Sequence, residues 1–317
     1  MRVLVTGGAG FIGSHLCDQL LERGHSVVAL DDLSLGREEN VAHLAGRTDF
    51  DFLELSIFAP EFDRKLAEGR FDAVFHMAAN SDIQAGARDR RVDLERTFLT
   101  TWTVCESMAR HRVHRLVFAS TSAIYGEVHE ATSEDHGPLI PVSFYGAAKL
   151  AGEAFCSAYA ARHGIQTWVY RFPNVVGSRA THGVILDFVR KLQATPDVLE
   201  VLGDGTQCKP YLHVQDLIEA MLLGFEKAKP DPYEVFNIGP ESKTTVREIA
   251  EAVVKSMGLE GRAAIRYGSD PIGWPGDVPT FAYELKKIHG LGWRARFDSG
   301  GAMRQGVLDI VAEQAGT

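Results

Sequence analysis

Short apolar runs alternate along the first half of the chain with longer segments in which apolar residues recur every three or four positions. The short runs are typical of buried strands and the longer segments of amphipathic helices. Their repeated strand–helix–strand order predicts a parallel sheet with right-handed crossovers, that is, a doubly wound, Rossmann-type α/β fold. The predicted strands are 3–5, 27–30, 71–77, 116–119 and 167–170, and the predicted helices are 14–23, 91–110 and 145–163.

The pattern changes after Arg171, where glycine and proline turns become more frequent and strands and helices no longer alternate regularly. We therefore expect a second, smaller domain toward the C-terminal end. The expected division is residues 1–173 for the doubly wound domain, with a segment of about 211–239 returning to it, and 174–317 mainly for a substrate-binding domain. Because no low-complexity linker separates the two, both should pack over a shared cleft.

Composition and charge narrow the classes of partner. Of the 317 residues, 45% are apolar and 24% are charged, which is an ordinary globular balance, and the net charge is −9. An acidic chain lacks the basic stripe with which a nucleic-acid binder displaces counterions. No apolar run reaches the roughly 20 residues of a membrane helix. We therefore expect no nucleic-acid partner and no membrane.

The cysteines and the amino terminus favour a cytoplasmic protein. Cys17, Cys105, Cys156 and Cys208 show no CxxC or Cys/His spacing, so we expect reduced thiols and no metal site. The amino terminus runs directly into a strand and a glycine turn, without the pattern of a signal peptide.

A glycine-rich turn follows the first predicted strand. Gly7, Gly10 and Gly13 have the spacing GxxGxxG and precede the first predicted helix. Glycines there permit a tight turn and let the backbone approach a pyrophosphate at the positive helix N-terminus. Asp31 and Asp32 end the next strand, where a carboxylate accepts hydrogen bonds from the adenosine ribose and repels a 2′-phosphate. This context predicts a dinucleotide site that prefers NAD to NADP.

A YxxxK motif and a Ser/Thr cluster predict the reacting centre. Tyr145 and Lys149 are four residues apart and share one face of the predicted helix. A phenol is a weak base at neutral pH, and we expect the nearby ammonium and the positive nicotinamide ring of bound NAD to lower its pKa. Thr121 and Ser122 follow a predicted strand, at the sheet edge where ligands bind in open α/β folds, and a hydroxyl there can hydrogen-bond the reacting oxygen.

The order of these motifs resembles the extended short-chain dehydrogenases/reductases. Nearly end to end, the chain is similar to the NAD-dependent epimerase/dehydratase family and, within it, to the compact UDP-galactose 4-epimerases. The later motifs are the more specific ones, because they belong to nucleotide-sugar enzymes. The motifs are TGGAGFIGSHL from Thr6, FHMAA from Phe75, STSAIYG from Ser120, SFYGAAKLAGE from Ser143, RFPNVVG from Arg171, HGVILDF from His182, GDGTQCKPYLHVQD from Gly203 and GWPGDVP from Gly273.

The resemblance implies a resident NAD, a nucleotide-diphosphate sugar as substrate, with a UDP-sugar favoured, and epimerisation at carbon-4. Tyr145 would take the proton of the 4-hydroxyl while hydride leaves carbon-4 for NAD, and hydride would return to the other face of the 4-keto sugar. The implied catalytic residues are Tyr145, Lys149, Thr121 and Ser122. The implied cofactor contacts are Gly7, Gly10, Phe11, Ile12, Gly13, Asp31, Asp32, Ser56, Ile57, Met77, Ala78, Ala79, Asp93, Tyr145, Lys149 and Pro173. The implied substrate contacts are Asn80, Ser81, Thr121, Tyr145, Asn174, Val184, Lys209, Trp274, Asp277 and Phe281.

One absence favours epimerisation within the family. Dehydratases typically place Asp-Glu after the catalytic Thr, and related decarboxylases use a Glu in the same turn, whereas this turn reads Thr121-Ser122-Ala123. The alternatives that stay open are a UDP-glucuronate 4-epimerase, a dehydratase, a decarboxylase, a 4-ketoreductase and a 5-epimerase. A non-catalytic dinucleotide sensor is a remote alternative, because Tyr145 and Lys149 are both intact.

Several positions depart from the family pattern near the cofactor. Ser56 precedes Ile57 where an Asp is usual beside the adenine, and Asp93 stands where an Asn is usual behind the nicotinamide. Asn80-Ser81-Asp82 is unusual after the Ala-Ala pair and falls near the expected sugar.

Further departures from the family pattern fall near the expected substrate. Ile272 and Trp274 stand where an arginine often meets the diphosphate, and Arg266 and Arg179 are the candidates to replace it. Phe281 falls near a position that gates bulk at carbon-2, where a large side chain favours a 2-hydroxyl over a 2-acetamido sugar.

The segments 91–110 and 145–163 resemble the helix pair that forms a four-helix bundle between subunits in this family, which implies a homodimer. The alternative is that their apolar stripes pack only on the sheet of their own chain.

Overall fold

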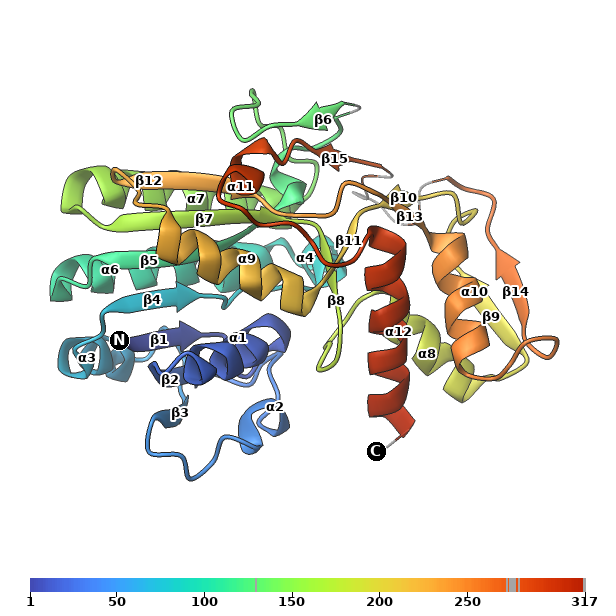
Figure 1. Cartoon of the computed structure of the whole chain (residues 1–317), viewed down its shortest axis with the longest axis horizontal. Helices are drawn as coiled ribbons and strands as arrows, with labels where there is room; N and C mark the ends of the chain where they lie inside the picture. Colours follow the sequence, from blue (N-terminus) through green and yellow to red (C-terminus); the bar gives the residue numbers. More distant parts are fainter. Residues whose placement is uncertain (129, 272, 274–277, 279, 316–317) are drawn as a thin grey trace.

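A seven-stranded sheet forms the centre of the larger part of the chain, and all of its strand pairs are parallel (Figure 1). The computed structural model describes residues 1–128, 130–271, 273, 278 and 280–315. The strand order β12-β7-β5-β4-β1-β2-β3 confirms the predicted doubly wound, Rossmann-type fold. The strands are β1 Arg2–Thr6, β2 Ser26–Asp31, β3 Phe50–Glu54, β4 Ala73–His76, β5 Arg115–Thr121, β7 Gln166–Phe172 and β12 Tyr233–Asn237.

The strand order reverses next to β1, which positions the site. The chain runs from β1 outward through β2 to β3 and then returns to add β4 on the other side of β1. At this switch point the connections that leave β1 and β4 diverge, and ligands of open α/β sheets bind in the resulting crevice at the carboxyl ends. Thr6 pairs with His76 at these ends, so the glycine turn after β1 lies beside the segment that follows β4.

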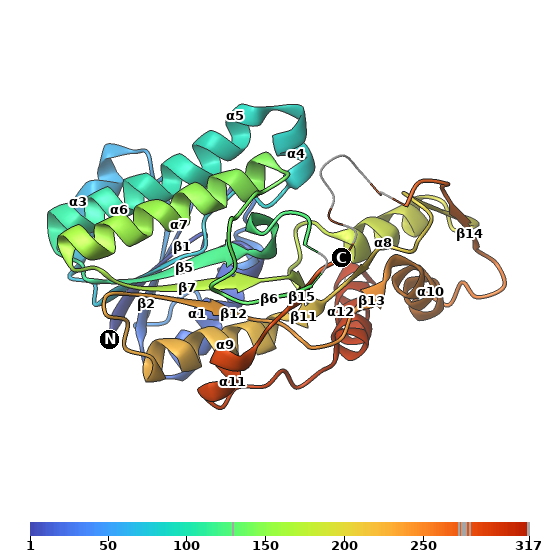
Figure 2. The same ribbon diagram turned by 90° about the horizontal axis from the view of Figure 1, so that it is seen from above.

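Helices cover both faces of the sheet because alternate strand residues point to opposite sides. Val3 and Val5 belong to a buried cluster with residues of α1 and α9, whereas Leu4 belongs to another with residues of α3, α6 and α7. Figure 2 shows these two helix layers on either side of the strands. The helices are α1 Phe11–Glu22, α3 Pro60–Gly69, α6 Thr100–His111, α7 Phe144–His163 and α9 Val214–Lys227, with the short α2 Glu39–Ala42, α4 Ile83–Arg88, α5 Arg90–Asp93 and α11 Lys286–Gly290.

A third buried cluster lies in the C-terminal part, among three helices and a two-stranded parallel sheet. The helices are α8 Val184–Ala194, α10 Val246–Ser256 and α12 Ser299–Ala315, and the strands are β9 Val198–Val201 and β14 Ala264–Tyr267. Three further strand pairs connect this part to the larger one (Figure 1). They are β6 Ala131–Thr132 with β15 Ala282–Tyr283, β8 Asn174–Val176 with β11 Tyr211–His213, and β10 Cys208–Lys209 with β13 Thr244–Thr245.

The segment predicted as one helix over 91–110 is interrupted. A π-helical turn, Leu94–Leu99, separates α5 from α6. Thr100 donates its hydroxyl to the carbonyl of Thr97 at 2.9 Å, and Thr101 donates to the same carbonyl at 2.8 Å. These side-chain bonds supply partners for a carbonyl in the widened turn. The turn packs against α7, which carries the YxxxK motif.

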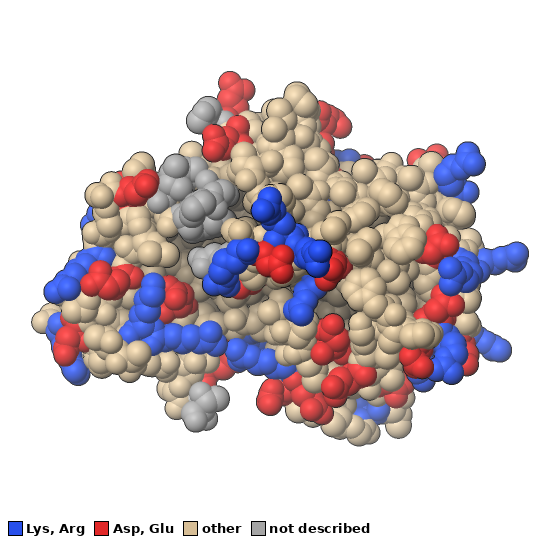
Figure 3. All heavy atoms as spheres, turned by 180° about the vertical axis from the view of Figure 1, so that it is seen from behind, with Lys and Arg blue, Asp and Glu red and all other residues tan. Residues whose placement is uncertain are grey.

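None of the helices in the described ranges combines the length and the apolar character that crossing a bilayer requires. On the face shown in Figure 3, acidic and basic side chains are interspersed.

Candidate active site

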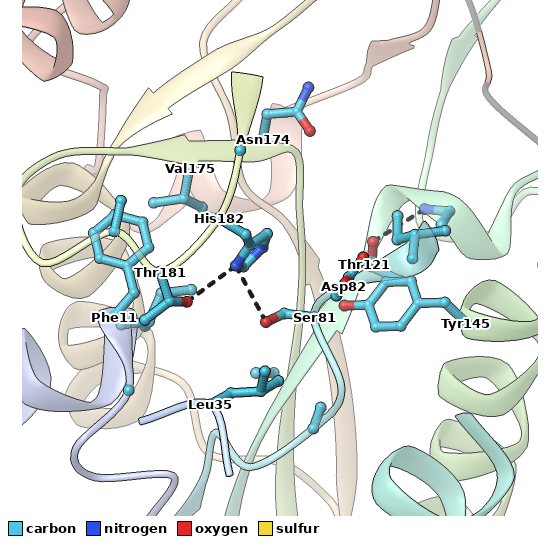
Figure 4. A pocket seen from close by; sticks show the side chains of 18 of the residues that line it. Phe11, Leu35, Ser81, Asp82, Thr121, Tyr145, Asn174, Val175, Thr181 and His182 are labelled. Carbon is cyan, nitrogen blue, oxygen red and sulfur yellow. Dashed lines mark hydrogen bonds between the residues drawn. The ribbon is translucent and has the colours of Figure 1, made fainter. Parts of the chain in front are cut away.

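A cavity of about 790 Å³ opens at the carboxyl edge of the sheet, and both parts of the chain line it. The turn after β1, the ends of β2 to β5 and the start of α7 contribute one wall, and β8, α8 and β10 contribute the other. In Figure 4, Phe11 and Thr181 lie at one side of the view and Tyr145 and Thr121 at the other, with His182 and Ser81 between them. The cavity therefore joins the glycine turn to the YxxxK motif.

The glycine turn has no room for a side chain at Gly7 or Gly13. Gly7 has a φ of +71°, and a Cβ on it would lie 2.7 Å from the backbone nitrogen of Ala78. A Cβ on Gly13 would lie 2.0 Å from the carbonyl oxygen of Gly7. Gly10 precedes the first residue of α1, so the open N–H groups of the first helical turn stand beside the cavity. This arrangement suits a pyrophosphate.

An acidic group stands at the end of β2. The Asp31 carboxylate accepts hydrogen bonds from the backbone nitrogens of Ala9 at 3.0 Å and Leu33 at 2.9 Å, which fix its orientation. Burial raises its pKa, and the two backbone bonds oppose that rise. Asp31 and Asp32 both line the cavity. The Asp31 carboxylate has lone pairs left to accept hydrogen bonds from the two hydroxyls of a ribose, and its charge would repel a 2′-phosphate on that ribose.

The residues present fit a dinucleotide, because a cradle without room for a Cβ leads to a fixed carboxylate through one continuous cavity. All but one of the residues expected at the cofactor line this cavity. They are Gly7, Gly10, Phe11, Ile12, Gly13, Asp31, Asp32, Ser56, Ile57, Met77, Ala78, Ala79, Tyr145, Lys149 and Pro173.

The structure brings the predicted catalytic side chains to the same cavity. Thr121 is the last residue of β5, and Tyr145 lies in the first turn of α7, which Ser143 caps by accepting from the Gly146 nitrogen at 3.1 Å. Lys149 is one turn further and is 2% exposed. Thr121, Ser122, Tyr145 and Lys149 all line the cavity.

The electrostatics of Tyr145 differ from the sequence-based expectation. Burial raises the pKa of its phenol, the charge of Asp93 raises it further, and the hydrogen bond with Thr121 lowers it. Lys149 donates to the carbonyl of Ala119 at 2.6 Å, and burial lowers its pKa to about 8. Lys149 is not among the groups that shift the pKa of the phenol, so the lowering expected from its ammonium is not found, whereas the lowering expected from the nicotinamide ring of bound NAD stays a prediction. The nicotinamide cation of bound NAD would supply the missing positive charge.

Asn80 and Asp93 lie behind the cavity wall and do not line it. They are 2% and 1% exposed, respectively. The Asn80 amide donates to Asp93 Oδ1 at 2.8 Å and to the carbonyl of Asp82 at 2.9 Å. The hydrogen bond from Asn80, which follows β4, to Asp93, which precedes the π-helical turn, holds these two segments together. Asp93 can therefore act on Tyr145 through its charge.

The expected substrate residues fall into three groups. Ser81, Asn174, Val184, Lys209 and Phe281 line the cavity, as do Thr121 and Tyr145. Asn80 is buried behind it, as described above. Trp274 and Asp277 lie outside the described residues, as does Ile272.

The two arginines expected to serve the diphosphate are bound elsewhere. Arg179 donates to Asp18 at 2.7 Å, and Arg266 donates to Glu200 at 3.3 Å in an exposed pair. Neither lines the cavity. The cations that line its α8 side are Arg190 and Lys191, to which the sequence assigned no role.

Other polar residues of the cavity had no predicted role. They are Asp82, Arg96, Thr181, His182 and Gln207. His182 and Gln207 belong to the motifs HGVILDF and GDGTQCKPYLHVQD, and Asp82 belongs to the unusual segment after the Ala-Ala pair, so a signal was available for these three. None of the recognised motifs contains Arg96 or Thr181.

A buried ion pair fixes α7 against the sheet beneath the cavity. Arg171 and Glu153 are 5% and 3% exposed and are joined by a 2.6 Å contact between Nη2 and Oε2. Arg171 also donates to the Tyr125 hydroxyl at 2.9 Å. Glu153 lies one turn beyond Lys149 on α7, and Ser120, beside Thr121, donates to it at 2.5 Å. The network thus connects both catalytic segments.

Comparisons with known proteins agree with this geometry. The sequence profile of the NAD dependent epimerase/dehydratase family matches residues 3–239. A UDP-glucose 4-epimerase of Corynebacterium glutamicum is 30% identical over 311 residues, which cover 92% of this chain and 90% of that protein.

Solved structures are similar over the whole chain. The crystal structure of a UDP-galactose 4-epimerase has a TM-score of 0.88 and 37% identity, and the match covers 99% of both chains. UDP-glucose 4-epimerase of Thermus thermophilus, solved in complex with NAD, has a TM-score of 0.85 and 32% identity over 98% of this chain and 99% of that one.

Proposed function

This chain belongs to the NAD dependent epimerase/dehydratase family, and we propose that it interconverts UDP-glucose and UDP-galactose. It is an NAD-dependent nucleotide-sugar 4-epimerase, because its full length is similar to UDP-glucose and UDP-galactose 4-epimerases, one of them solved with NAD. The choice of sugar is our proposal, and the relatives described above support it.

One observation carries the proposal of mechanism. The Thr121 hydroxyl, the Tyr145 phenol and the Lys149 ammonium meet at the carboxyl edge of the sheet, and the turn Thr121-Ser122-Ala123 contains no carboxylate. Elimination of water needs an acid and a base beside the sugar in addition to the phenol. The absence of a carboxylate beside Thr121 fits a reaction in which Tyr145 takes up a single proton and returns it.

The residues then have separate tasks. Thr121 holds the sugar O4 and the Tyr145 oxygen in one hydrogen-bonded group, so that the proton moves between O4 and the phenol oxygen over a short distance. Lys149, fixed by the Ala119 carbonyl, keeps further N–H donors for the nicotinamide ribose. NAD held by these residues would supply the hydride acceptor for carbon-4, and the same hydride would return to the opposite face of the 4-keto sugar. Burial of the phenol keeps it protonated at neutral pH until a positive charge is present beside it.

We assign the cavity-lining residues expected at the cofactor to NAD, with Asp31 at the adenosine ribose. Asn174, Val184 and Lys209 are assigned to the nucleotide diphosphate. The start of α8 at Val184 supports this assignment, because open N–H groups at a helix N-terminus attract a diphosphate. Asn80 and Asp93 are assigned a supporting place behind the wall, since they do not reach the cavity.

We further propose a homodimer formed through α6, α7 and the π-helical turn. Large apolar side chains are exposed there: Leu94 by 51%, Trp102 by 41% and Phe155 by 41%. Exposed large apolar side chains on elements that pack against one another are typical of a subunit interface. Trp102→Glu should convert the dimer to monomers in analytical ultracentrifugation, because a buried charge at the interface would be unpaired. Leu308→Glu on α12, where the leucine is 55% exposed, should leave the assembly unchanged. A wild-type monomer would contradict the proposal.

Two further proposals concern organisation. We propose that residues 1–173 and about 211–239 form the NAD-binding domain, which the return of α9 and β12 to the large sheet supports. A cytoplasmic location is supported by the four cysteines, all of which are free thiols.

The experiment is to incubate the purified protein with UDP-glucose, UDP-galactose, UDP-glucuronate and dTDP-glucose without added reductant and to identify the products by NMR. We expect UDP-glucose and UDP-galactose to interconvert with no net NADH. A product that has lost water or carbon dioxide would refute the 4-epimerase assignment. No turnover by a protein that binds NAD would favour the sensor alternative.

A further inference from the structure

We propose that His182 determines sugar specificity by hydrogen-bonding a hydroxyl of the sugar through Nε2, and that with Asp82 it selects an uncharged sugar over a uronic acid. This inference rests on the proposed 4-epimerase function.

The ring of His182 is held in the cavity by its other nitrogen. Nδ1 lies 3.1 Å from the Thr181 hydroxyl and 3.4 Å from the Ser81 hydroxyl, as the dashed lines of Figure 4 show. Thr181 precedes α8 in the C-terminal part, whereas Ser81 follows β4 in the larger part. The imidazole therefore bridges the two walls, and both hydroxyls restrict its rotation.

The bridge lies toward the catalytic end of the cavity. Ser81 belongs to the segment after β4, and β4 pairs with β5, whose last residue is Thr121. In Figure 4, Ser81 lies between His182 and the pair Thr121 and Tyr145. The imidazole therefore lies on the cavity wall beside the segment that leads to the catalytic residues.

The second ring nitrogen remains for a ligand. Among the residues that the structure describes, Nε2 of His182 has no hydrogen-bond partner, and the residue lines the cavity. The His182 side chain is exposed to the cavity, and partial desolvation by the walls lowers its pKa, an effect that outweighs the opposite effect of Asp82. The lowered pKa favours the neutral ring, in which one nitrogen is a donor and the other an acceptor. A neutral ring pairs well with a hydroxyl, which both donates and accepts, and lacks the positive charge that a carboxylate needs.

Asp82 adds a charge against a uronic acid. It lines the cavity and caps α4, where it accepts from the Ala85 nitrogen at 3.1 Å. Arg88 approaches it only at 3.6 Å and is largely exposed to solvent, so the carboxylate is poorly neutralised. Its charge acts on the His182 ring, which places it close enough to act on a sugar there. A second carboxylate on the sugar would be repelled.

Two substitutions of His182 distinguish the contribution of Nδ1 from that of Nε2. The amide of His182→Asn can occupy the place of Nδ1 and keep the Ser81 and Thr181 bonds, but it cannot reach the place of Nε2. The longer His182→Gln can reach it. We expect the Asn variant to raise KM for UDP-glucose about tenfold, the equivalent of about 1.4 kcal/mol for one lost hydrogen bond. We expect kcat to change by less than about twofold, since the contact is made in the ground state as well as the transition state. The Gln variant should stay within about threefold of wild type in KM.

The controls are the inhibition constant of UDP, which should be unchanged in both variants, and the bound NAD and melting temperature, which report folding. Equal KM values in wild type and the Asn variant would overturn the inference. So would a tenfold weaker UDP inhibition, because it would place the contact on the nucleotide.

A measurement on the wild-type protein keeps the inference testable even if a variant fails to fold. We expect kcat/KM for UDP-glucose to exceed that for UDP-glucuronate on the order of 100-fold, since like charges at close range cost several kcal/mol. Asp82→Asn should bring the kcat/KM values for UDP-glucose and UDP-glucuronate closer together, because it removes the negative charge that repels the uronic acid. Equal wild-type turnover of both substrates would overturn the inference and leave the 4-epimerase function intact. Absence of turnover with every sugar nucleotide would refute the proposed function itself and, with it, the inference.

Discussion

Gly13→Ala tests the cofactor cradle most sharply. The added Cβ would lie 2.0 Å from the carbonyl oxygen and 2.8 Å from the carbonyl carbon of Gly7, and contacts of this kind are essentially not found below 3.0 Å. The turn must therefore shift by about 1 Å, against backbone atoms that cannot rotate away. Overpacking of this kind costs about 1–3 kcal/mol. If NAD binding must restore the native turn, this cost weakens binding by about 5- to 150-fold.

The assay is isothermal titration of the NAD-stripped protein, together with the NAD content after purification. Gly290→Ala is the matched control, because a Cβ at Gly290 meets no atom within 4 Å. We expect it to bind NAD like wild type. The reasoning is refuted if the Gly13 variant also binds within twofold of wild type, because the cradle would then tolerate the side chain or lie away from the pyrophosphate.

Two further predictions concern the residues behind the cavity. Glu153→Ala leaves the buried Arg171 guanidinium unpaired and should lower the free energy of unfolding by about 3–5 kcal/mol. Arg262→Ala breaks an exposed ion pair with Asp197 and should lower the free energy of unfolding by less than about 1 kcal/mol. Denaturant titrations with saturating NAD measure this free energy for both variants. Equal decreases in the two variants would contradict the account. Asp93→Asn keeps the bond to Asn80 but removes a negative charge that raises the Tyr145 pKa, so the acidic limb of the kcat/KM profile should move to lower pH. An unmoved limb, or one shifted to higher pH, would show that Asp93 does not act on the phenol.

Local patterns were enough to predict the fold and the cofactor turn. The apolar runs identify five of the seven strands of the large sheet, and β3 and β12 were not predicted. Gly7 and Gly13 lie between the first strand and the first helix, and Asp31 ends the second strand, as their order in the sequence predicted. The hydroxyl at Thr121 and the YxxxK helix were predictable for the same reason, since each is positioned by the element that carries it.

What the sequence did not predict depends on contacts between distant segments. Arg179 donates to Asp18 of the first helix. The sequence does not show this ion pair, which keeps the arginine away from the diphosphate. The Tyr145 pKa follows burial and the charge of Asp93, neither of which a YxxxK spacing contains. The bridge from Ser81 to His182 joins residues 101 positions apart.

The most direct test of the central claim is the fate of a deuterium label at carbon-4. We would convert UDP-[4-²H]glucose with the purified protein in ordinary water, without added cofactor, and analyse the UDP-galactose by NMR. The account predicts that the product keeps its deuterium at carbon-4, and that Tyr145→Phe, which removes only the phenol oxygen, loses most of the turnover. Deuterium replaced by solvent hydrogen, or full turnover by the Phe variant, would contradict hydride return to carbon-4 with Tyr145 as the base.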